Sequence, residues 1–310
     1  MRIAAVVVAY RVDPAALAEL LDRLQSVCSA TIVVVNKADT AQRTALPETH
    51  PAVDWLFNED NRGLAFAQNQ GLARARNHAV DAVLLLDQDT LPTAQGIETL
   101  AGVLARRCGD GERVAAVGPA YHQPNGGEWP GFVVYRPWGF SRVHPRGERA
   151  EVAVDFLIAS GSLIPLAALD DVGDMDEGLF IDHVDTEWCL RARAKGWSLV
   201  GVPVVSFSHC LGERQRQVWL GRWRSVAVYP PWRYYMMLRN SVLLYQRPAL
   251  SRLWKWGDAW RSLGLIVWVC IAGPRRLASS RAVIRGAIDG WRGRKGPPPA
   301  GLMTGRHDEE

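Results

Sequence analysis

Short apolar stretches alternate with amphipathic stretches through the first 120 residues, and this alternation constrains the fold most. "IAAVVVAY" (3–10) and "TIVVVN" (31–36) are runs typical of strands that are buried on both faces. Between them, "DPAALAELLDRLQSV" offers Asp13 as an N-cap and Pro14 at the first helical position, followed by leucines at helical spacing. Two strands joined through a helix in this way are parallel neighbours.

The same order continues along the chain. We expect further strands at "VDWLF", "AVLLLD" and "VAAVGP", and a helix after the turn at Gly63 in "NRGLAFAQNQGLARARNHA". The sequence therefore predicts an α/β fold with a mostly parallel central sheet flanked by helices. Farther on, "VDFLIASGSLIPLAALDDVG" predicts a strand, a turn at Gly161 and a short helix. "HVDTEWCLRARAKGW" predicts a helix and "SLVGVPVVSFSH" a strand, whereas residues 130–150 fit no element.

The charges are distributed unevenly over the 310 residues. Residues 1–210 hold 18 Lys and Arg against 26 Asp and Glu, a balance of −8, whereas residues 211–310 hold 18 against 6, a balance of +12. We expect an α/β domain over 1–225, a basic helical extension rich in Trp and Arg over 226–295, and a disordered tail over 296–310. The basic extension indicates an anionic partner.

The composition also excludes several classes of protein. The cysteines are scattered and odd in number, which argues against a disulfide framework or a zinc ribbon and favours a reducing compartment. "MRIAAVVVAY" is interpreted as a first strand, not a signal peptide, and the uncharged run 262–274 is shorter than the ~20 residues that a spanning helix needs. We therefore expect a cytoplasmic protein.

Two carboxylates follow the predicted fourth strand. Asp87 and Asp89, one residue apart, stand where ligands of parallel sheets bind, beyond the carboxyl ends of the strands. Tyr10, Asn36 and Asn58 fall at the ends of three other strands. Oxygens at this spacing can hold Mg²⁺ or Mn²⁺, which completes its shell with substrate phosphates. The alternative is a solvated turn at the end of a strand.

Small residues line the start of the third helical stretch. Asn61 and Gly63 form a tight turn, and Ala65, Ala67 and Gly71 keep the helix slim, so that a phosphate-bearing ligand can approach its N-terminus. The alternative is a helix whose small residues serve only its packing.

Two more positions carry candidate chemistry. Asp185 begins a predicted helix, where it is either a cap or a general base above the edge of the sheet. His209 ends a strand, and it is either structural or a ligand.

Together these motifs resemble those of family 2 glycosyltransferases of the GT-A fold, and most of all bacterial rhamnosyltransferases that build cell-surface polysaccharide. The resemblance covers about residues 3 to 245 and rests on "VVAYRVDP", "NRGLAFAQNQG", "LLLDQDT", "FLIASGSLI", "LFIDHVDTEWCLRARAKGW", "HCLGE" and "RYYMMLRN". It implies a nucleotide-sugar donor, dTDP-L-rhamnose, and as acceptor a hydroxyl of a glycan or of a lipid-linked molecule.

The resemblance also implies the roles of individual residues. Asp87 and Asp89 match the metal-binding pair that grips the donor diphosphate, and His209 matches a histidine that joins the metal shell. Asp185 matches the base of an inverting transfer, a role that Glu187 or Asp182 could share. The donor-binding positions that it implies are Tyr10, Asn36, Asn61, Gly63, Asn69 and Asp87.

The basic extension has two interpretations. Around "RRLASSRAVIRGAIDGWRGRK", Leu277, Ile284, Ile288 and Trp291 fall near one helical face among arginines, which is typical of a helix on anionic lipid at the inner face of the cell membrane. The alternative is packing on its own domain or a homo-oligomer. We expect no nucleic-acid partner, because no motif for one is present.

Two other classes of function stay open at this point. A phosphatase of the haloacid-dehalogenase type also ends a strand in two aspartates, but Leu91 departs from that pattern and the motif lies far from the N-terminus. A non-catalytic protein that binds a nucleotide-sugar, or a scaffold, is the other alternative. Release of phosphate from a phosphomonoester would indicate the first, and absence of donor turnover the second.

Overall fold

The computed structural model describes residues 1–122, 131–137, 139–144, 151–209, 215–219, 223–271, 273 and 275–303. The strands are β1 (Ile3–Ala9), β2 (Ala30–Val35), β3 (Asp54–Phe57), β4 (Ala82–Asp87), β5 (Thr90–Leu91), β6 (Val114–His122), β7 (Phe132–Arg136), β8 (Gly139–Val143), β9 (Val152–Val154), β10 (Leu163–Pro165), β11 (Ser198–His209), β12 (Gln215–Trp219) and β13 (Trp223–Ala227). The helices are α1 (Pro14–Gln25), α2 (Thr40–Thr49), α3 (Leu64–Ala75), α4 (Ala94–Gly109), α5 (Leu166–Val172), the 3₁₀ turn η1 (Glu177–Leu179), α6 (Val184–Ala194), α7 (Pro231–Tyr245), α8 (Arg252–Ile271), α9 (Arg276–Trp291) and α10 (Ala300–Met303).

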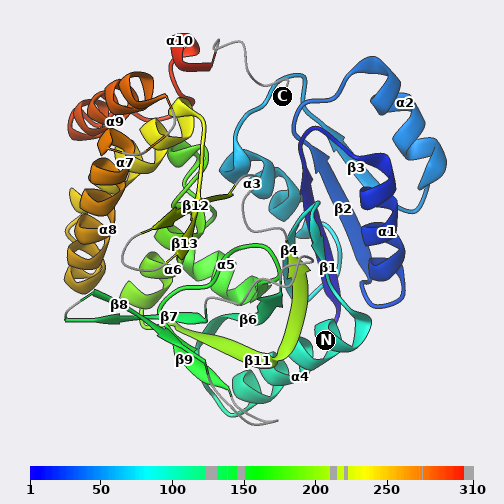
Figure 1. The fold of residues 1–310 in the computed structure, drawn as a ribbon. Coiled ribbons are helices and arrows are strands. Elements are labelled where there is room, and N and C mark those ends of the chain that lie inside the picture. The colour runs from blue at the N-terminus through cyan, green and yellow to red at the C-terminus, as the bar shows by residue number, and fades with distance from the viewer. Residues whose placement is uncertain are drawn as a thin grey trace.

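A central sheet with the strand order β3-β2-β1-β4-β10-β6-β11-β5 organises the molecule (Figure 1). β1 runs parallel to both β2 and β4, β2 runs parallel to β3, and β6 runs parallel to β11. The short strand β10 lies antiparallel between β4 and β6. The predicted α/β fold with a mostly parallel sheet is thus confirmed.

Helices cover both faces of the sheet, because the strands are apolar on both sides. β1 is buried along its whole length. Leucines of α1 and α4 pack with Ile3, Ala5 and Val7 on one face, whereas small residues of α3 and side chains of α6 pack with Ala4 and Val6 on the other. A Cβ atom on Gly71 would lie 2.2 Å from Val6, so the predicted slimness of α3 is needed for its close approach to the sheet.

The register of the strands brings distant polar residues to one edge. Asp87 ends β4 opposite Val8 of β1. The chain then turns, and Thr90 in β5 pairs antiparallel with His209 at the end of β11. The sheet itself therefore holds the histidine beside the two aspartates that precede β5.

The structure differs from the sequence prediction in two places. Within 130–150, which fitted no element, β7 and β8 form an antiparallel hairpin beside α8. In the predicted tail 296–310, the backbone N–H of Gly296 donates to the carbonyl of Gly178 at 2.8 Å, and α10 follows. Residues 304–310 lie outside the described part of the chain.

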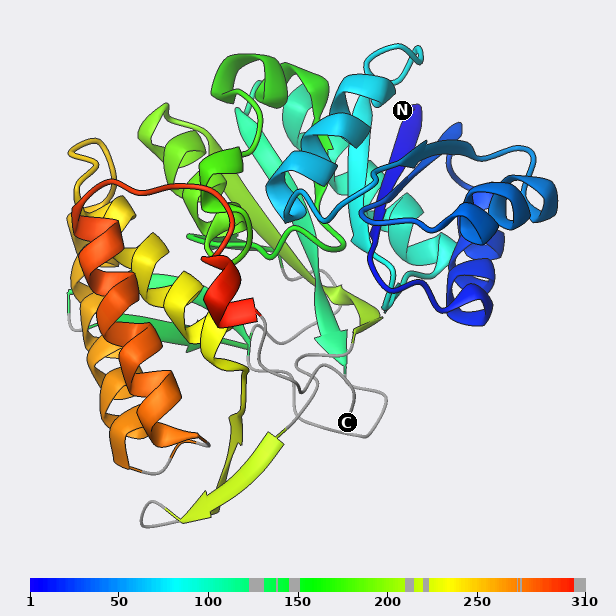
Figure 2. The same cartoon turned by 90° about the horizontal axis from the view of Figure 1, so that it is seen from above.

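Three long helices, α7, α8 and α9, lie within residues 226–295, the stretch that the sequence analysis expects to be helical. They stand at one edge of the molecule, with α7 on the inner side (Figure 2). α9 packs closely on α7, because a Cβ on Gly286 or Gly290 would lie 2.5 Å from the carbonyl oxygen of Tyr235 or Arg239. Among the described residues, no helix combines the length and the apolar character that crossing a membrane requires.

We expect the substitution Gly63→Ala to destabilise the fold by about 1–3 kcal/mol, because Gly63 has φ +90° and its new Cβ would lie 2.6 Å from the ring of Phe180. Chemical denaturation measures the change. Gly102→Ala is the matched control, since Gly102 lies in α4 and a Cβ added there would have nothing within 4 Å. The control should be neutral or stabilising by up to about 1 kcal/mol. Equal effects of the two substitutions would contradict the prediction.

Candidate active site

Three potential ligands of a cation meet where β4, β5 and β11 end. Asp87, Asp89 and His209 each place one ligand atom within 4.8 Å of the ligand atoms of the other two. Oδ1 of Asp89 lies 3.4 Å from Nδ1 of His209. The structure thus brings together the three residues that the sequence proposed as a metal site.

A chain of buried hydroxyl groups supports this cluster from behind. The backbone N–H of Asp87 donates to Oγ of Ser160 at 2.7 Å. That oxygen lies 2.7 Å from Oγ1 of Thr90, which lies 2.6 Å from Nδ1 of His209. Ser160 and Thr90 are both buried. The imidazole is therefore held in orientation by groups that water does not reach, as is typical of histidines that bind metals.

The electrostatics of the cluster favour a bound cation. Burial and the negative charge of Asp89 raise the pKa of Asp87 to about 6. Burial lowers the pKa of His209, but the hydrogen bond and charge of Asp89 outweigh this effect, and the pKa is raised. Two carboxylates that repel one another, together with an imidazole, are ligands that suit Mg²⁺ or Mn²⁺. The residues fit the predicted ion.

Asp185 lies near this cluster, at the second position of α6. Its charge contributes to the raised pKa of Asp87, so the two carboxyl groups influence one another electrostatically. The backbone N–H of Thr186 donates to Oδ1 of Asp185 at 2.7 Å. Burial nevertheless raises the pKa of Asp185 to about 6. A carboxyl group with such a pKa can accept a proton near neutral pH. The N-cap of α6 is His183 and not Asp185.

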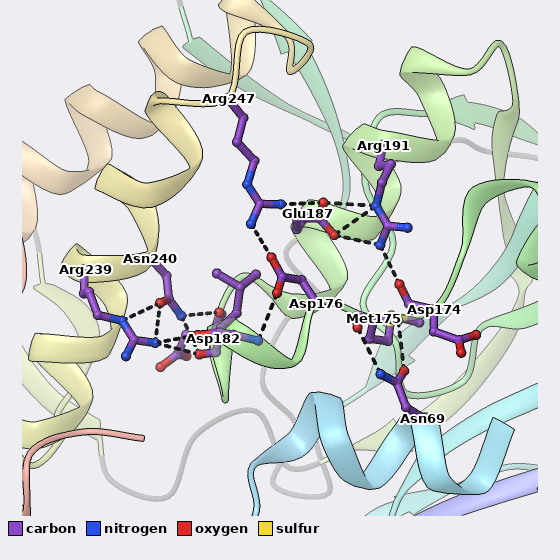
Figure 3. Close-up of polar contacts among 12 residues, drawn as sticks. Asn69, Asp174, Met175, Asp176, Asp182, Glu187, Arg191, Arg239, Asn240 and Arg247 are labelled. Atoms are coloured by element: carbon purple, nitrogen blue, oxygen red, sulfur yellow. Dashed lines mark hydrogen bonds and ion pairs between the residues drawn. The ribbon is translucent and has the colours of Figure 1, made fainter. Parts of the chain in front are cut away.

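The loop before α6 has an unusual backbone that α7 holds in place. Phe180, Asp182 and His183 all have positive φ, between 60° and 65°. The Nδ2 group of Asn240 donates to the carbonyls of Leu179, Ile181 and Asp182 at 2.7–3.0 Å. In Figure 3, Asn240 and Arg239 extend from α7 toward this loop.

Arg233, also in α7, brings a positive charge to the site that we did not predict. Its guanidinium donates to Oδ1 of Asp182 at 3.2 and 3.3 Å, and its charge lowers the pKa of Asp87. Arg233 begins "RYYMMLRN", the motif that also contains Arg239 and Asn240. The motif was part of the resemblance, but the sequence alone does not show which strand ends or loops it faces.

Glu187 does not reach the site, contrary to the predicted shared role as base. It is 2% exposed, and its carboxylate accepts from Arg191 at 2.9 Å and from Arg247 at 2.7 Å (Figure 3). Arg247 also pairs with Asp176. Glu187 therefore ties α6 to α7 and to the preceding loop. We retain Asp185 as the candidate base.

The asparagines predicted to bind a donor form the framework of a loop instead. Asn36 is buried, donates to Oδ1 of Asn61 and to the carbonyl of Gly63, and accepts from Asn58 and the N–H of Arg62. Oδ1 of Asn61 accepts from the N–H of Gly63 at 2.9 Å. Since these bonds occupy the Asn36 amide, its part in any donor site is to shape the turn before α3.

Asn69 and Tyr10, both predicted to bind a donor, differ in how far protein contacts occupy their side chains. Asn69 donates to the carbonyl of Met175 and to Glu177, and accepts from the N–H of Met175, so its amide links α3 to another loop (Figure 3). The predicted donor contact of Asn69 is therefore not supported. Tyr10 is 38% exposed at the end of β1, and the guanidinium of Arg11 lies over its ring, 5.6 Å from the centroid.

Comparisons with known proteins support the fold described above. No family model matches the chain. It is similar to dTDP-rhamnosyl transferase RfbF of Shigella flexneri, with 24% identity over 290 residues that cover 93% of this chain and 95% of that protein. Among solved structures it is similar to GalNAc-T7 with UDP, GalNAc and Mn²⁺, with TM-score 0.55, 13% identity, and coverage of 67% of this chain and 43% of that chain. It is also similar to S. aureus TarS, with TM-score 0.50, 12% identity, and coverage of 94% and 43%. This chain thus spans less than half the length of either solved chain. Both structures have the fold that the sequence predicted.

We expect Asn240→Ala to lower the free energy of unfolding by about 2–4 kcal/mol, because the carbonyls of Ile181 and Asp182 lose their donor and the carbonyl of Leu179 loses one of its donors. The control is Asn77→Ala, since the Asn77 side chain is exposed and should change the stability by no more than about 0.5 kcal/mol. Denaturant unfolding followed by tryptophan fluorescence measures both. If Asn77→Ala lowered the free energy of unfolding as much as Asn240→Ala, the stabilising role of the Asn240 hydrogen bonds would be contradicted.

Asp185→Asn should stabilise the protein at neutral pH and above. An aspartate in the unfolded chain loses its proton near pH 3.8, and the folded Asp185 near pH 6, so the wild-type fold loses stability as the pH rises through this window. The substitution removes that cost, which we expect to be about 3 kcal/mol at pH 7.5 and close to zero at pH 3.5. Unfolding of both proteins over this pH range is the measurement, and a pH-independent difference would contradict the burial of this carboxylate.

Proposed function

Because the chain is a glycosyltransferase of the GT-A fold, we propose that it transfers L-rhamnose from dTDP-L-rhamnose to a hydroxyl group with inversion at the anomeric carbon. The acceptor we propose is a cell-surface glycan or a lipid-linked molecule. The sugar is supported by the similarity to dTDP-rhamnosyl transferase RfbF. The observation that carries the reaction class is the convergence of Asp87, Asp89 and His209 at a strand edge beside Asp185.

Asp185 is the base in this proposal. Its carboxylate removes the proton of the acceptor hydroxyl while the hydroxyl oxygen attacks the anomeric carbon. The bond from that carbon to the diphosphate oxygen breaks on the opposite face, and the nucleoside diphosphate leaves with the electron pair. Burial matches the pKa of Asp185, about 6, to this task, because the group is ionised at pH 7 and still basic enough to hold a proton.

Positive charge is needed opposite the donor diphosphate. Asp87, Asp89 and His209 would hold the divalent cation, which when bound supplies the charge that stabilises the leaving group. Arg233 adds a guanidinium near the same carboxylates. The partly exposed ring of Tyr10 provides a surface on which the nucleobase can stack.

A single displacement also agrees with the state of the other acids. Glu187 is buried and paired with two arginines, so it is not available as a nucleophile of the protein, and Oδ1 of Asp182 is held by Arg233. One base without a covalent intermediate gives inversion of the anomeric centre. A double displacement would require a second carboxylate beside the anomeric carbon.

We expect thermal unfolding with Mn²⁺ and dTDP-L-rhamnose to report donor binding through a rise in Tm that requires both ligands. Asp89→Asn should lose the dependence on Mn²⁺. Asp185→Asn should keep the rise in Tm but lose transfer by about 10²–10⁴-fold, because it removes the base and not the donor site. Asp110→Asn, with an Asp110 side chain 63% exposed at the end of α4 and outside these motifs, is the control and should behave as wild type.

Each part of the proposal has its own contrary result. A rise in Tm with a UDP-sugar but not with dTDP-L-rhamnose would overturn the donor and leave the class of enzyme. Full transfer by Asp185→Asn would overturn the base. Donor binding without turnover to any hydroxyl acceptor or water would favour the non-catalytic alternative.

A further inference from the structure

The outward face of α8 consists of large apolar side chains. Six of them are between 42% and 68% exposed and recur at spacings of three and four residues: Leu253, Trp256, Trp260, Leu263, Val267 and Ile271. A helix of 20 residues is about 30 Å long, so this face runs over most of that length. An exposed apolar surface of this size marks a site of interaction.

The charged residues of α8 beyond its first position are directed inward, the reverse of an ordinary surface helix. Asp258 is 1% exposed and pairs with Arg261 at 2.7 Å. Lys255 donates to the carbonyl of Arg247. Between Leu253 and Ile271 no charged side chain of the helix is fully exposed. The sequence of α8 therefore places its large apolar side chains outward and its ionic groups toward the protein.

α9 adds a second apolar stripe that is bordered by cations. Leu277, Ile284, Ile288 and Trp291 are 43–77% exposed and lie on one side of the helix. Three exposed arginines, Arg281, Arg285 and Arg292, follow its edge. The acid of this helix, Asp289, is 2% exposed and pairs with Arg294 at 2.8 Å and with Arg285 at 3.7 Å. Within Arg252–Ile271 and Arg276–Trp291, no carboxylate is exposed.

We propose that the outward faces of α8 and α9, the outer apolar face, dock on the surface of an anionic lipid bilayer. The apolar side chains enter the boundary between headgroups and acyl chains, and the arginines contact lipid phosphates. Exposed Trp256, Trp260 and Trp291 suit this boundary, since an indole has an apolar body and one polar N–H.

The charges favour lipid over a second copy of the chain. If two copies joined through this face, their arginines would meet without any exposed carboxylate of these helices to pair with. Anionic phosphates supply the opposite charge. Because no described helix can cross a membrane, the helices lie on the bilayer and do not span it. Both stand at the outer edge of the molecule, where a flat surface can reach them (Figures 1 and 2).

The test is flotation of the full chain with vesicles of phosphatidylglycerol and phosphatidylcholine, compared with vesicles of phosphatidylcholine alone. We expect binding to the anionic vesicles that weakens with added salt. The variant Trp256→Glu/Trp260→Glu should bind at least about tenfold more weakly, because burial of one large apolar side chain corresponds to a factor of ten or more. Arg281→Gln/Arg285→Gln/Arg292→Gln should lose the preference for anionic vesicles.

Val204→Glu is the matched control, since Val204 is an exposed apolar residue of β11, 55% exposed and outside these helices. It should bind vesicles as wild type does. All variants should keep the rise in Tm with donor and Mn²⁺, which separates loss of lipid binding from misfolding. No binding to anionic vesicles by the wild-type chain would overturn the proposal. So would a dimer in light scattering that the Trp256→Glu/Trp260→Glu variant dissociates, because it would assign the face to a second copy.

Discussion

The grip of α7 on the loop between η1 and α6 is the constraint on which the rest of the structure depends. The loop contains three non-glycine residues with positive φ, which costs of order 1–3 kcal/mol each. A backbone of this shape cannot form regular hydrogen bonds, so its carbonyls need other donors. Asn240 donates to three of them, and Arg239 donates to the carbonyls of Gly178 and Leu179. Two adjacent residues of α7 thus supply the hydrogen-bond donors that the backbone carbonyls of this region need.

The same loop joins the two halves of the candidate site. The carbonyl of Phe180 accepts from the N–H of Leu64 at 2.6 Å, so the loop also fixes the start of α3 behind the turn at Gly63. On its other side it leads directly into the first turn of α6, where Asp185 lies. The cation cluster, in contrast, is fixed by the pairing of β5 with β11. A rigid sheet therefore positions the acids for the metal, and a strained loop positions the candidate base.

Structural features that depend on neighbouring residues could be predicted from the sequence. Contacts between residues far apart in the chain could not. Strand ends are local features, and a parallel sheet brings its ends to one edge, so Asp87 and Asp89 could be predicted at the ligand-binding edge, whereas the role of His209 as a ligand came from the resemblance. The roles of Glu187 and Asn69 could not, because their partners Arg247 and Met175 lie 60 and 106 residues away in the chain. The sequence does not distinguish a polar residue that contacts a ligand from one that pairs with an arginine of another helix. The strained backbone of residues 180–183 could not be predicted either, because the loop contains no glycine, the residue that usually indicates a positive φ.

α8 has an outer apolar face and an inner face that contacts the loop before α6. The helix therefore links the edge of the molecule to the candidate site. On the inner face, Oδ1 of Asp258 accepts from Arg261, and Nη2 of Arg261 lies 3.1 Å from Nε2 of His183, the N-cap of α6. An arginine can only donate, so Nε2 of His183 is the acceptor in this pair. Moving α8 away from α7 would break the contact of Arg261 with His183 and the hydrogen bond that the hydroxyl of Tyr245 in α7 donates to Oδ2 of Asp258 at 2.7 Å. The position of α8 is therefore tied to the conformation of the loop two residues before Asp185, and a surface that binds on the outer face of α8 acts on a helix that cannot shift independently of the site.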